Sequence, residues 1–224
     1  MKAYFTPACP RFLAGLATHN TREWFQEHKE TFKDEVEKPF IELVGDLIEA
    51  LKEYDPRIQI TAKEAVFRIY RDTRFSKDKT PYKEHVSALV SPNGRKDHSH
   101  PGFYFEILAS GIRMYSGVYE PEPAQLKNIR YYLAGHLAEF KAVYSDPVFE
   151  KRFGSLLGEK SKVLPADLKA AALEEPQLYN KNFYVVCERP KSLITDAGLL
   201  KELVQCWLDA RRLNAFFEKA LKET

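Results

Sequence analysis

The chain has 224 residues, of which 44% are hydrophobic and 29% charged, and its formal net charge is +2. A chain of this length can bury a sufficient core without disulfides or metals, and its near-neutral charge disfavours a broad nucleic-acid-binding surface. No apolar run approaches the roughly 20 residues that span a bilayer. The three cysteines (Cys9, Cys187 and Cys206) show no metal-type spacing. We therefore expect a soluble, cytoplasmic protein with reduced thiols, no membrane association and no cofactor.

The first third of the sequence predicts helices. Thr6 followed by Pro7 is typical of a helix start, and Asn20 with Glu23 three residues later resembles a capping box. Apolar residues then recur at intervals of three and four from Phe32 to Leu51. Pro39 is expected either to begin a second helix or to kink a longer one.

The middle of the sequence predicts strands. Apolar and polar residues alternate in three segments, and a short apolar run adds a fourth. These segments are Phe67–Tyr70, Val86–Val90, Phe103–Leu108 and Ile112–Tyr119. The short connection at Ser110 and Gly111 predicts a hairpin between the last two.

Helical patterns return after Pro121, and Asp146 with Pro147 predicts a short helix that ends at Phe153. Residues 154–182 predict irregular structure, Phe183–Cys187 a strand, and Thr195 or Asp196 the cap of a final helix. The fold class that follows is α+β. We expect a single domain over residues 1–224, in which N-terminal and C-terminal helices pack on a central, mainly antiparallel sheet.

The most distinctive segment is the motif from Phe67 to Lys83. Residues 63–83 contain seven lysines or arginines and three acidic residues, a local net charge of +4 on a chain whose total is +2. Such a concentration of cations predicts a site for a phosphate or carboxylate group. We expect Arg71 and Arg74 to share an anion with Lys77 or Lys79. The candidate ligand-binding residues are Arg68, Arg71, Arg74, Ser76, Lys77, Lys79, Tyr82 and Lys83.

Three alternatives stay open for this motif. Asp72 and Asp78 could neutralise its cations, so that the loop only clips the helices to the sheet. The protein could instead be an enzyme acting on a phosphorylated or carboxylated small molecule, with Glu106, Asp72 or His85 as candidate bases. It could also be an interaction module whose basic loop docks an acidic protein or nucleic acid, with bases stacking on Tyr70, Phe75 and Tyr82. The sequence does not decide whether the protein is an enzyme.

Two smaller features favour structural roles. His98 and His100 lie two residues apart, but the pattern lacks further ligands, and we expect no structural metal. Glu106 and Arg113 lie on opposite strands of the predicted hairpin and could form a cross-strand ion pair.

The chain resembles the family known as the domain of unknown function 2461. The resemblance rests on the opening from Phe12 to Phe25, on the motif from Phe67 to Lys83, and on the strand start at Pro101-Gly-Phe-Tyr. The helix from Pro121 to Arg130 and the later Lys181-Asn-Phe183 are also similar. The resemblance covers nearly the whole chain. It implies a conserved, mainly bacterial type of protein, and it implies no particular activity.

Overall fold

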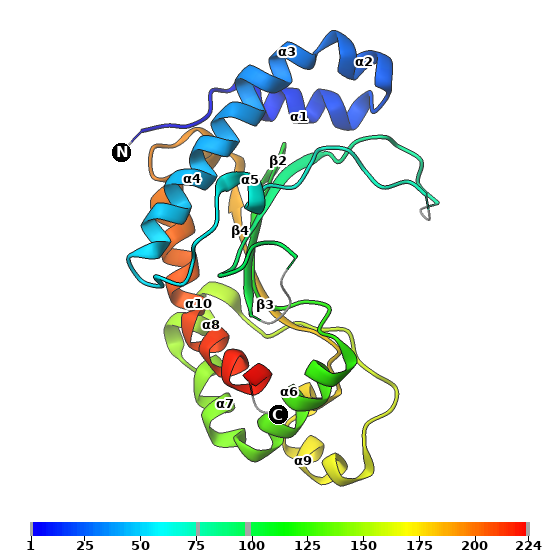
Figure 1. Ribbon diagram of the computed structural model, residues 1–224, viewed down its shortest axis with the longest axis vertical. Helices are drawn as coiled ribbons and strands as arrows, with labels where there is room; N and C mark the ends of the chain where they lie inside the picture. Colours follow the sequence, from blue (N-terminus) through cyan, green and yellow to red (C-terminus); the bar gives the residue numbers. More distant parts are fainter. Residues whose placement is uncertain (1, 75–76, 97–99, 223–224) are drawn as a thin grey trace. The chain divides into compact units, whose positions relative to one another are not determined.

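The structure is a computed structural model that describes residues 2–74, 77–96 and 100–222 (Figure 1). The chain divides into two compact units, each assembled from three segments. Unit 1 comprises Met1–Arg95, Tyr104–Met114 and Glu188–Val204, and unit 2 comprises Lys96–Phe103, Tyr115–Cys187 and Gln205–Thr224.

The strands form one antiparallel sheet in the order β1-β2-β3-β4. They are β1 (His85–Val90), β2 (Gly102–Leu108), β3 (Gly111–Val118) and β4 (Phe183–Pro190). The alternation that predicted β2 places Phe105 and Ile107, both fully buried, on one face. Glu106, between them, must then point to the opposite face. The predicted α+β class with an antiparallel sheet is confirmed.

A two-residue turn joins β2 to β3, as the sequence predicts. β3 begins at Gly111, whose φ is +156°. A Cβ atom at this position would lie 2.3 Å from the carbonyl oxygen of Arg189 on β4. Glycine is therefore required here because the backbone of β4 passes too close for any side chain.

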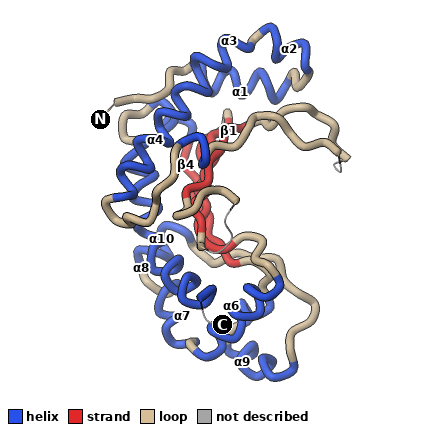
Figure 2. The backbone as a smooth tube through the Cα atoms, in the orientation of Figure 1, coloured by secondary structure: helices blue, strands red, loops and turns tan. Residues whose placement is uncertain are grey.

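In unit 1, α4 covers one side of the strands, and the segment between α5 and β1 extends away on the other (Figures 1 and 2). The ring of Phe40 on α4 packs 5.4 Å from that of Phe105 on β2. The helical elements of this unit are α1 (Ala8–Thr18), α2 (Arg22–Glu27), α3 (Lys29–Phe32), η1 (Lys33–Glu37), α4 (Lys38–Lys52), α5 (Ala62–Ala65) and η4 (Lys191–Thr195). The π-turn η1 precedes Pro39, which is the first-turn residue of α4. The backbone stays helical from α3 through η1 into α4, so Pro39 lies in a longer helix that the π-turn interrupts, and it does not begin a separate one.

The start of α2 differs from the prediction. The N-cap is Thr21, whose hydroxyl accepts a hydrogen bond from the Trp24 amide at 3.3 Å. Asn20 instead binds the main chain of Tyr82, 62 residues away: its Nδ2 donates to the Tyr82 carbonyl at 3.0 Å, and its Oδ1 accepts from the Tyr82 amide at 3.1 Å. Asn20 therefore ties the end of the cationic motif to the N-terminal helices.

The predicted strand Phe67–Tyr70 is wrong in detail. Val66 and Tyr70 each form a single antiparallel bridge, to Ala88 and Tyr82 respectively, and no continuous strand forms between them. The Arg71 amide donates to the Pro81 carbonyl at 2.9 Å, but Pro81 has no N–H with which to return a bond. The motif therefore folds back on itself as an irregular hairpin.

Unit 2 is mainly helical. Its elements are α6 (Pro123–Gly135), α7 (Leu137–Tyr144), α8 (Pro147–Phe153), η2 (Ala166–Leu168), α9 (Lys169–Glu174), η3 (Pro176–Tyr179) and the C-terminal part of α10 (Leu199–Lys222). Asp146 caps α8 as predicted. The core of unit 2 is aromatic: the ring centroids of Phe183 and Phe217 lie 5.1 Å apart. Residues 154–182, expected to be irregular, contain α9 and two 3-10 turns between extended segments.

All three cysteines are buried thiols. Burial raises the pKa of the Cys9 thiol to about 12, and the nearby Glu35 adds to the shift. No helix within the described part of the chain combines the length and the apolar character needed to cross a bilayer.

Candidate functional site

The two arginines at the centre of the cationic motif are each paired with an aspartate of the same motif. Arg71 contacts Asp78 and also donates to the Thr80 hydroxyl at 2.8 Å. Arg74 forms a bidentate ion pair with Asp72: its Nε donates to Oδ1 at 3.0 Å and its Nη2 to Oδ2 at 2.7 Å. The hydrogen bonds from Arg74 lower the pKa of Asp72 to about 2. These contacts match the clip alternative for this part of the loop.

The two lysines that follow Arg74 in the sequence make different contacts. Lys79 donates from Nζ to the Thr73 carbonyl at 2.8 Å, which closes the loop further. Lys77 is exposed. Ser76, another candidate from the sequence, lies outside the described residues, as does Phe75.

Tyr82 is part of the hydrophobic core. It is 3% exposed, and its ring stacks on Phe25 of α2 at 4.1 Å. Its backbone is held by Asn20 as described above. The ring has no open face for a ligand, so the structure gives Tyr82 the role of anchoring the motif. Tyr70, in contrast, is 48% exposed.

Lys83, the last residue of the motif, is the cation with the most unusual surroundings. It is partly buried, and its Nζ lies 5.0 Å from the ring centroid of Phe67. The guanidinium of Arg95 lies 5.7 Å from the same centroid, and its Nη1 donates to the Lys63 and Glu64 carbonyls at the end of α5. Two cations therefore share one aromatic ring.

The charges around Lys83 are mostly of its own sign. Burial lowers the pKa of Lys83, and the positive charges of Arg68, Arg71 and Arg95 lower it further; Glu106 acts weakly in the opposite direction. Among residues 2–74, 77–96 and 100–222, no carboxylate oxygen lies within 4.0 Å of Lys83 or Arg68. Positive potential thus accumulates at this point without an adjacent counter-charge.

A buried carboxylate organises the neighbouring face of the sheet. Glu106 on β2 is 7% exposed. Tyr104 donates to its Oε2 at 2.9 Å, His85 Nε2 on β1 lies 3.5 Å from the same oxygen, and Arg113 Nη1 on β3 lies 3.5 Å from Oε1. The cross-strand ion pair between Glu106 and Arg113 is confirmed. Arg113 also donates from Nε to Glu188 on β4 at 2.9 Å, so all four strands contribute.

His85 connects this carboxylate with the cations. It lies two residues from Lys83 in the sequence, and the charges of Lys83 and Arg71 both act on it. Burial lowers the pKa of His85, and Lys83 and Arg71 lower it further, against the opposing effect of Glu106. The imidazole is therefore held neutral at neutral pH. A cationic group, a neutral imidazole and a carboxylate together can bind an oxyanion and can also move a proton.

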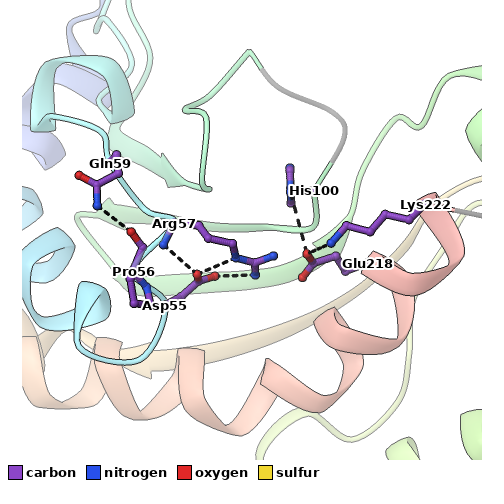
Figure 3. Close-up of polar contacts among 7 residues, drawn as sticks. All are labelled: Asp55, Pro56, Arg57, Gln59, His100, Glu218 and Lys222. Atoms are coloured by element: carbon purple, nitrogen blue, oxygen red, sulfur yellow. Dashed lines mark hydrogen bonds and ion pairs between the residues drawn. The ribbon is translucent and has the colours of Figure 1, made fainter.

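Other polar groups have structural roles (Figure 3). In unit 1, Arg57 forms a bidentate ion pair with Asp55, in which both nitrogen–oxygen distances are 2.8 Å. Gln59 donates to the Pro56 carbonyl at 2.6 Å. These contacts shape the connection from α4 to α5.

In unit 2, Glu218 accepts from Lys222 at 2.7 Å and lies 4.0 Å from His100 Nε2 (Figure 3). His98, considered with His100 as a metal fragment, is outside the described residues. Within those residues, the side chains of His, Cys, Asp and Glu form no group of three or more that could hold a metal.

A shallow depression of about 270 Å³ lies elsewhere in unit 1, between α1, α2 and α3. Its wall is formed by Trp24 stacked on His28 at 4.1 Å, with Phe12 and Arg11 beside them. None of the motif's cations lines it. The depression is therefore separate from the candidate site.

Sequence reasoning identified part of this arrangement. Arg68, Arg71 and Lys83 were expected in the site, and His85 and Glu106 were considered as bases. Arg95 was missed because it follows a turn at Gly94, well after the motif, and only the fold brings it to Phe67. The alternation of β2, which excludes Glu106 from the face of Phe105 and Ile107, was the available signal for a polar face.

The chain belongs to the family of conserved hypothetical proteins DUF2461, whose family model matches residues 8–216. This match confirms the resemblance described from the sequence. No curated protein matches the chain.

Proposed function

We propose that the protein binds a small molecule through its phosphate or carboxylate group, at a site centred on Lys83 and Arg68. The observation that carries this proposal is the setting of Lys83. It is partly buried, three guanidinium groups raise the positive potential around it, and no described carboxylate lies within 4.0 Å.

The crowding of positive charge around Lys83 costs free energy. Like charges held close together in a partly desolvated place disfavour the folded state unless a counter-charge is supplied. An oxyanion placed between Lys83 and Arg68 supplies it, with the guanidinium able to bind two oxygens at once. Arg71 is engaged by Asp78, so it contributes mainly through its potential.

The remaining cations are assigned smaller roles. Arg74 is engaged by Asp72 and Lys79 by the Thr73 carbonyl, while Lys77 is exposed. They add to the positive field that attracts an anion to the loop. Ser76, a candidate from the sequence, lies outside the described residues and is assigned no role. Tyr82 supports the site by anchoring the loop.

Phosphate binding tests the proposal. We expect inorganic phosphate to raise the melting temperature relative to sodium chloride of equal ionic strength, by an amount equivalent to about 2.7 kcal/mol at 100 times its dissociation constant. Lys83→Met should abolish this response, Arg68→Met should weaken it, and the matched exposed variant Lys77→Met should change it little. Arg74→Ala should reduce it modestly and leave the fold intact.

A screen of phosphorylated and carboxylated metabolites by the same assay would identify the ligand class. Single-stranded oligonucleotides and an acidic peptide form a further arm for the interaction-module alternative. If neither phosphate, sulfate nor any metabolite stabilises the protein beyond the chloride control, the anion site is refuted and the motif is a structural clip.

A second candidate function is acid–base catalysis on the same class of ligand. The specific observation is that His85, neutral and 3.5 Å from the buried Glu106, lies two residues from Lys83. His85 would accept a proton from the bound substrate or from an attacking water, and Glu106 would stabilise the resulting imidazolium. Turnover of a ligand found in the screen, lost in His85→Gln while binding persists, would establish catalysis. Binding of the ligand without turnover would contradict catalysis and support ligand binding alone.

A further inference from the structure

We propose that unit 2 contains a second oxyanion site, formed by the buried guanidinium of Arg130. Its ligand is a carboxylate or phosphate group. The site is built from residues of unit 2 alone and does not depend on the site at Lys83.

Arg130 lies on the buried face of α6 and is 9% exposed. Its Nη2 donates to the carbonyl oxygens of Asn180 at 3.1 Å and Tyr179 at 3.4 Å. Its Nε is fully enclosed and has no hydrogen-bond partner, and Nη1 has no acceptor among the described residues. Only one of the three guanidinium nitrogens is therefore engaged.

No carboxylate within the described ranges lies within 4.0 Å of this guanidinium. The other enclosed arginine of unit 2 provides the contrast: Arg152, whose side chain is 15% exposed, is paired with Asp209. An ionised group taken out of water costs several kcal/mol unless a partner of opposite charge compensates it. Arg130 has carbonyl dipoles in place of such a partner, and burial lowers its pKa. A guanidinium keeps its proton even so.

The segment whose carbonyls Arg130 contacts also carries two side-chain amides, Asn180 and Asn182. Asn180 is 0% exposed, and its Oδ1 has no hydrogen-bond partner, while its Nδ2 donates to Gln177 at 2.8 Å. Asn182 accepts the Glu159 amide on its Oδ1 at 2.8 Å, which orients its NH₂ group as a donor. Gly158 lets the adjacent backbone approach, since a Cβ there would lie 2.1 Å from the Asn182 carbonyl oxygen.

These features together define a receptor for negative charge. The guanidinium supplies fixed positive charge and an unengaged Nε–H donor, and no described carboxylate lies within 4.0 Å to compete for it. A neutral ligand could satisfy the free donors but could not offset the charge. An oxyanion does both, and a planar carboxylate or a phosphate fits the guanidinium fork.

The resonance of Arg130 Nε–H in a ¹⁵N-labelled protein tests the proposal directly. The titration uses sodium acetate and, separately, sodium phosphate, each against sodium chloride at equal ionic strength. It is carried out in Lys83→Met, so that the site in unit 1 does not contribute. We expect the Arg130 Nε–H signal and the side-chain amide signals of Asn182 to shift saturably with acetate, phosphate or both.

Two variants complete the experiment. Arg130→Lys, which keeps the charge and loses the fork, identifies the Nε–H signal by its absence and should weaken the Asn182 response at least tenfold. Arg212→Lys, an exposed arginine of the same unit paired with Asp146 at 3.0 Å, should leave it unchanged. An Nε–H signal that does not move, or that moves equally in chloride, overturns the proposal. So does an Asn182 shift that is the same in Arg130→Lys. The first of these needs no variant of Arg130 to fold.

Discussion

Lys83 in unit 1 and Arg130 in unit 2 are both cations without a described carboxylate partner, but their surroundings differ. Lys83 is partly buried among other cations, on an aromatic ring shared with Arg95. Arg130 is nearly enclosed, and two backbone carbonyls are its acceptors. The first setting is a local excess of positive charge, which solvent still screens. The second is a single charge withdrawn from solvent.

The difference shows that charge density along the sequence does not indicate which cation lacks a partner. Arg71 and Arg74 belong to the densest charged stretch of the chain, and both are paired with aspartates. Arg130 stands next to Ile129 in an ordinary amphipathic helix, and its hydrogen bonds depend on residues 49 and 50 positions away. Burial and contact, and not composition, separate the two kinds of site.

Truncation of the two cations should give the largest contrast in stability. Arg130→Ala removes the donor to two carbonyls and leaves a cavity, so we expect the free energy of unfolding to fall by about 2–4 kcal/mol. Lys83→Ala removes a crowded charge with little packing, so its effect should stay within about 1 kcal/mol of zero. Urea denaturation in phosphate-free buffer measures both.

Arg130→Met is the matched control for volume, because it fills most of the space and removes the charge. Its cost should be smaller than that of Arg130→Ala, since no large cavity is left. Equal effects of Arg130→Ala and Lys83→Ala would show that the two settings do not differ as described.

Replacement of Asn20 should reduce stability by an intermediate amount and affect only the Lys83 region. Asn20→Ala deprives the Tyr82 amide and carbonyl of their partners, and we expect a loss of about 1–3 kcal/mol. Because Tyr82 precedes Lys83, phosphate should also stabilise this variant less, while the acetate response at Arg130 should persist. Gln26→Ala, at an exposed position of the neighbouring helix α2, should change stability by less than about 0.5 kcal/mol. A normal phosphate response in a destabilised Asn20→Ala would separate the anchor from the site.

The smallest expected effect is a pH dependence from His85. Its pKa in the folded protein lies below the value of 6.5 in the unfolded chain, mainly because of burial. As pH falls below 6.5, the unfolded state takes up the proton first, so stability decreases until the folded-state pKa is reached. Glu106 and Glu84 oppose this shift, and Lys83 and Arg71 enhance it. His85→Gln should lose stability less steeply than the wild type between pH 7 and 5 in urea denaturation; parallel slopes would contradict this assignment.

Much of the fold was predictable from local patterns. The alternation around Phe105 predicted β2, the turn before Gly111 predicted the hairpin, and Asp146 with Pro147 predicted the start of α8. The errors arose where distant contacts decide. Asn20 has the features of a helix cap, but Tyr82 engages it. The segment from Phe67 to Tyr70 alternates like a strand, but the bridges at its two ends, to Ala88 and Tyr82, differ in register, so no continuous ladder forms.

The candidate site was predictable only in part. Arg68 and Lys83 could be selected for their charge, but their lack of partners depends on Asp72 and Asp78 binding Arg74 and Arg71 instead. Arg95 reaches Phe67 only through the turn at Gly94. Sequence patterns give the types of group available, and the three-dimensional fold decides which of them remain to meet a ligand.

The buried thiols allow the opening of each unit to be timed separately. Cys9 belongs to unit 1, and Cys187 and Cys206 belong to unit 2. An alkylating reagent can modify each thiol only during excursions that expose it, and site-resolved mass spectrometry can follow the three rates in one sample. A ligand at Lys83 should slow modification of Cys9 in particular, whereas one at Arg130 should slow that of the other two. The native thiols therefore report the opening rate of each unit without any added label.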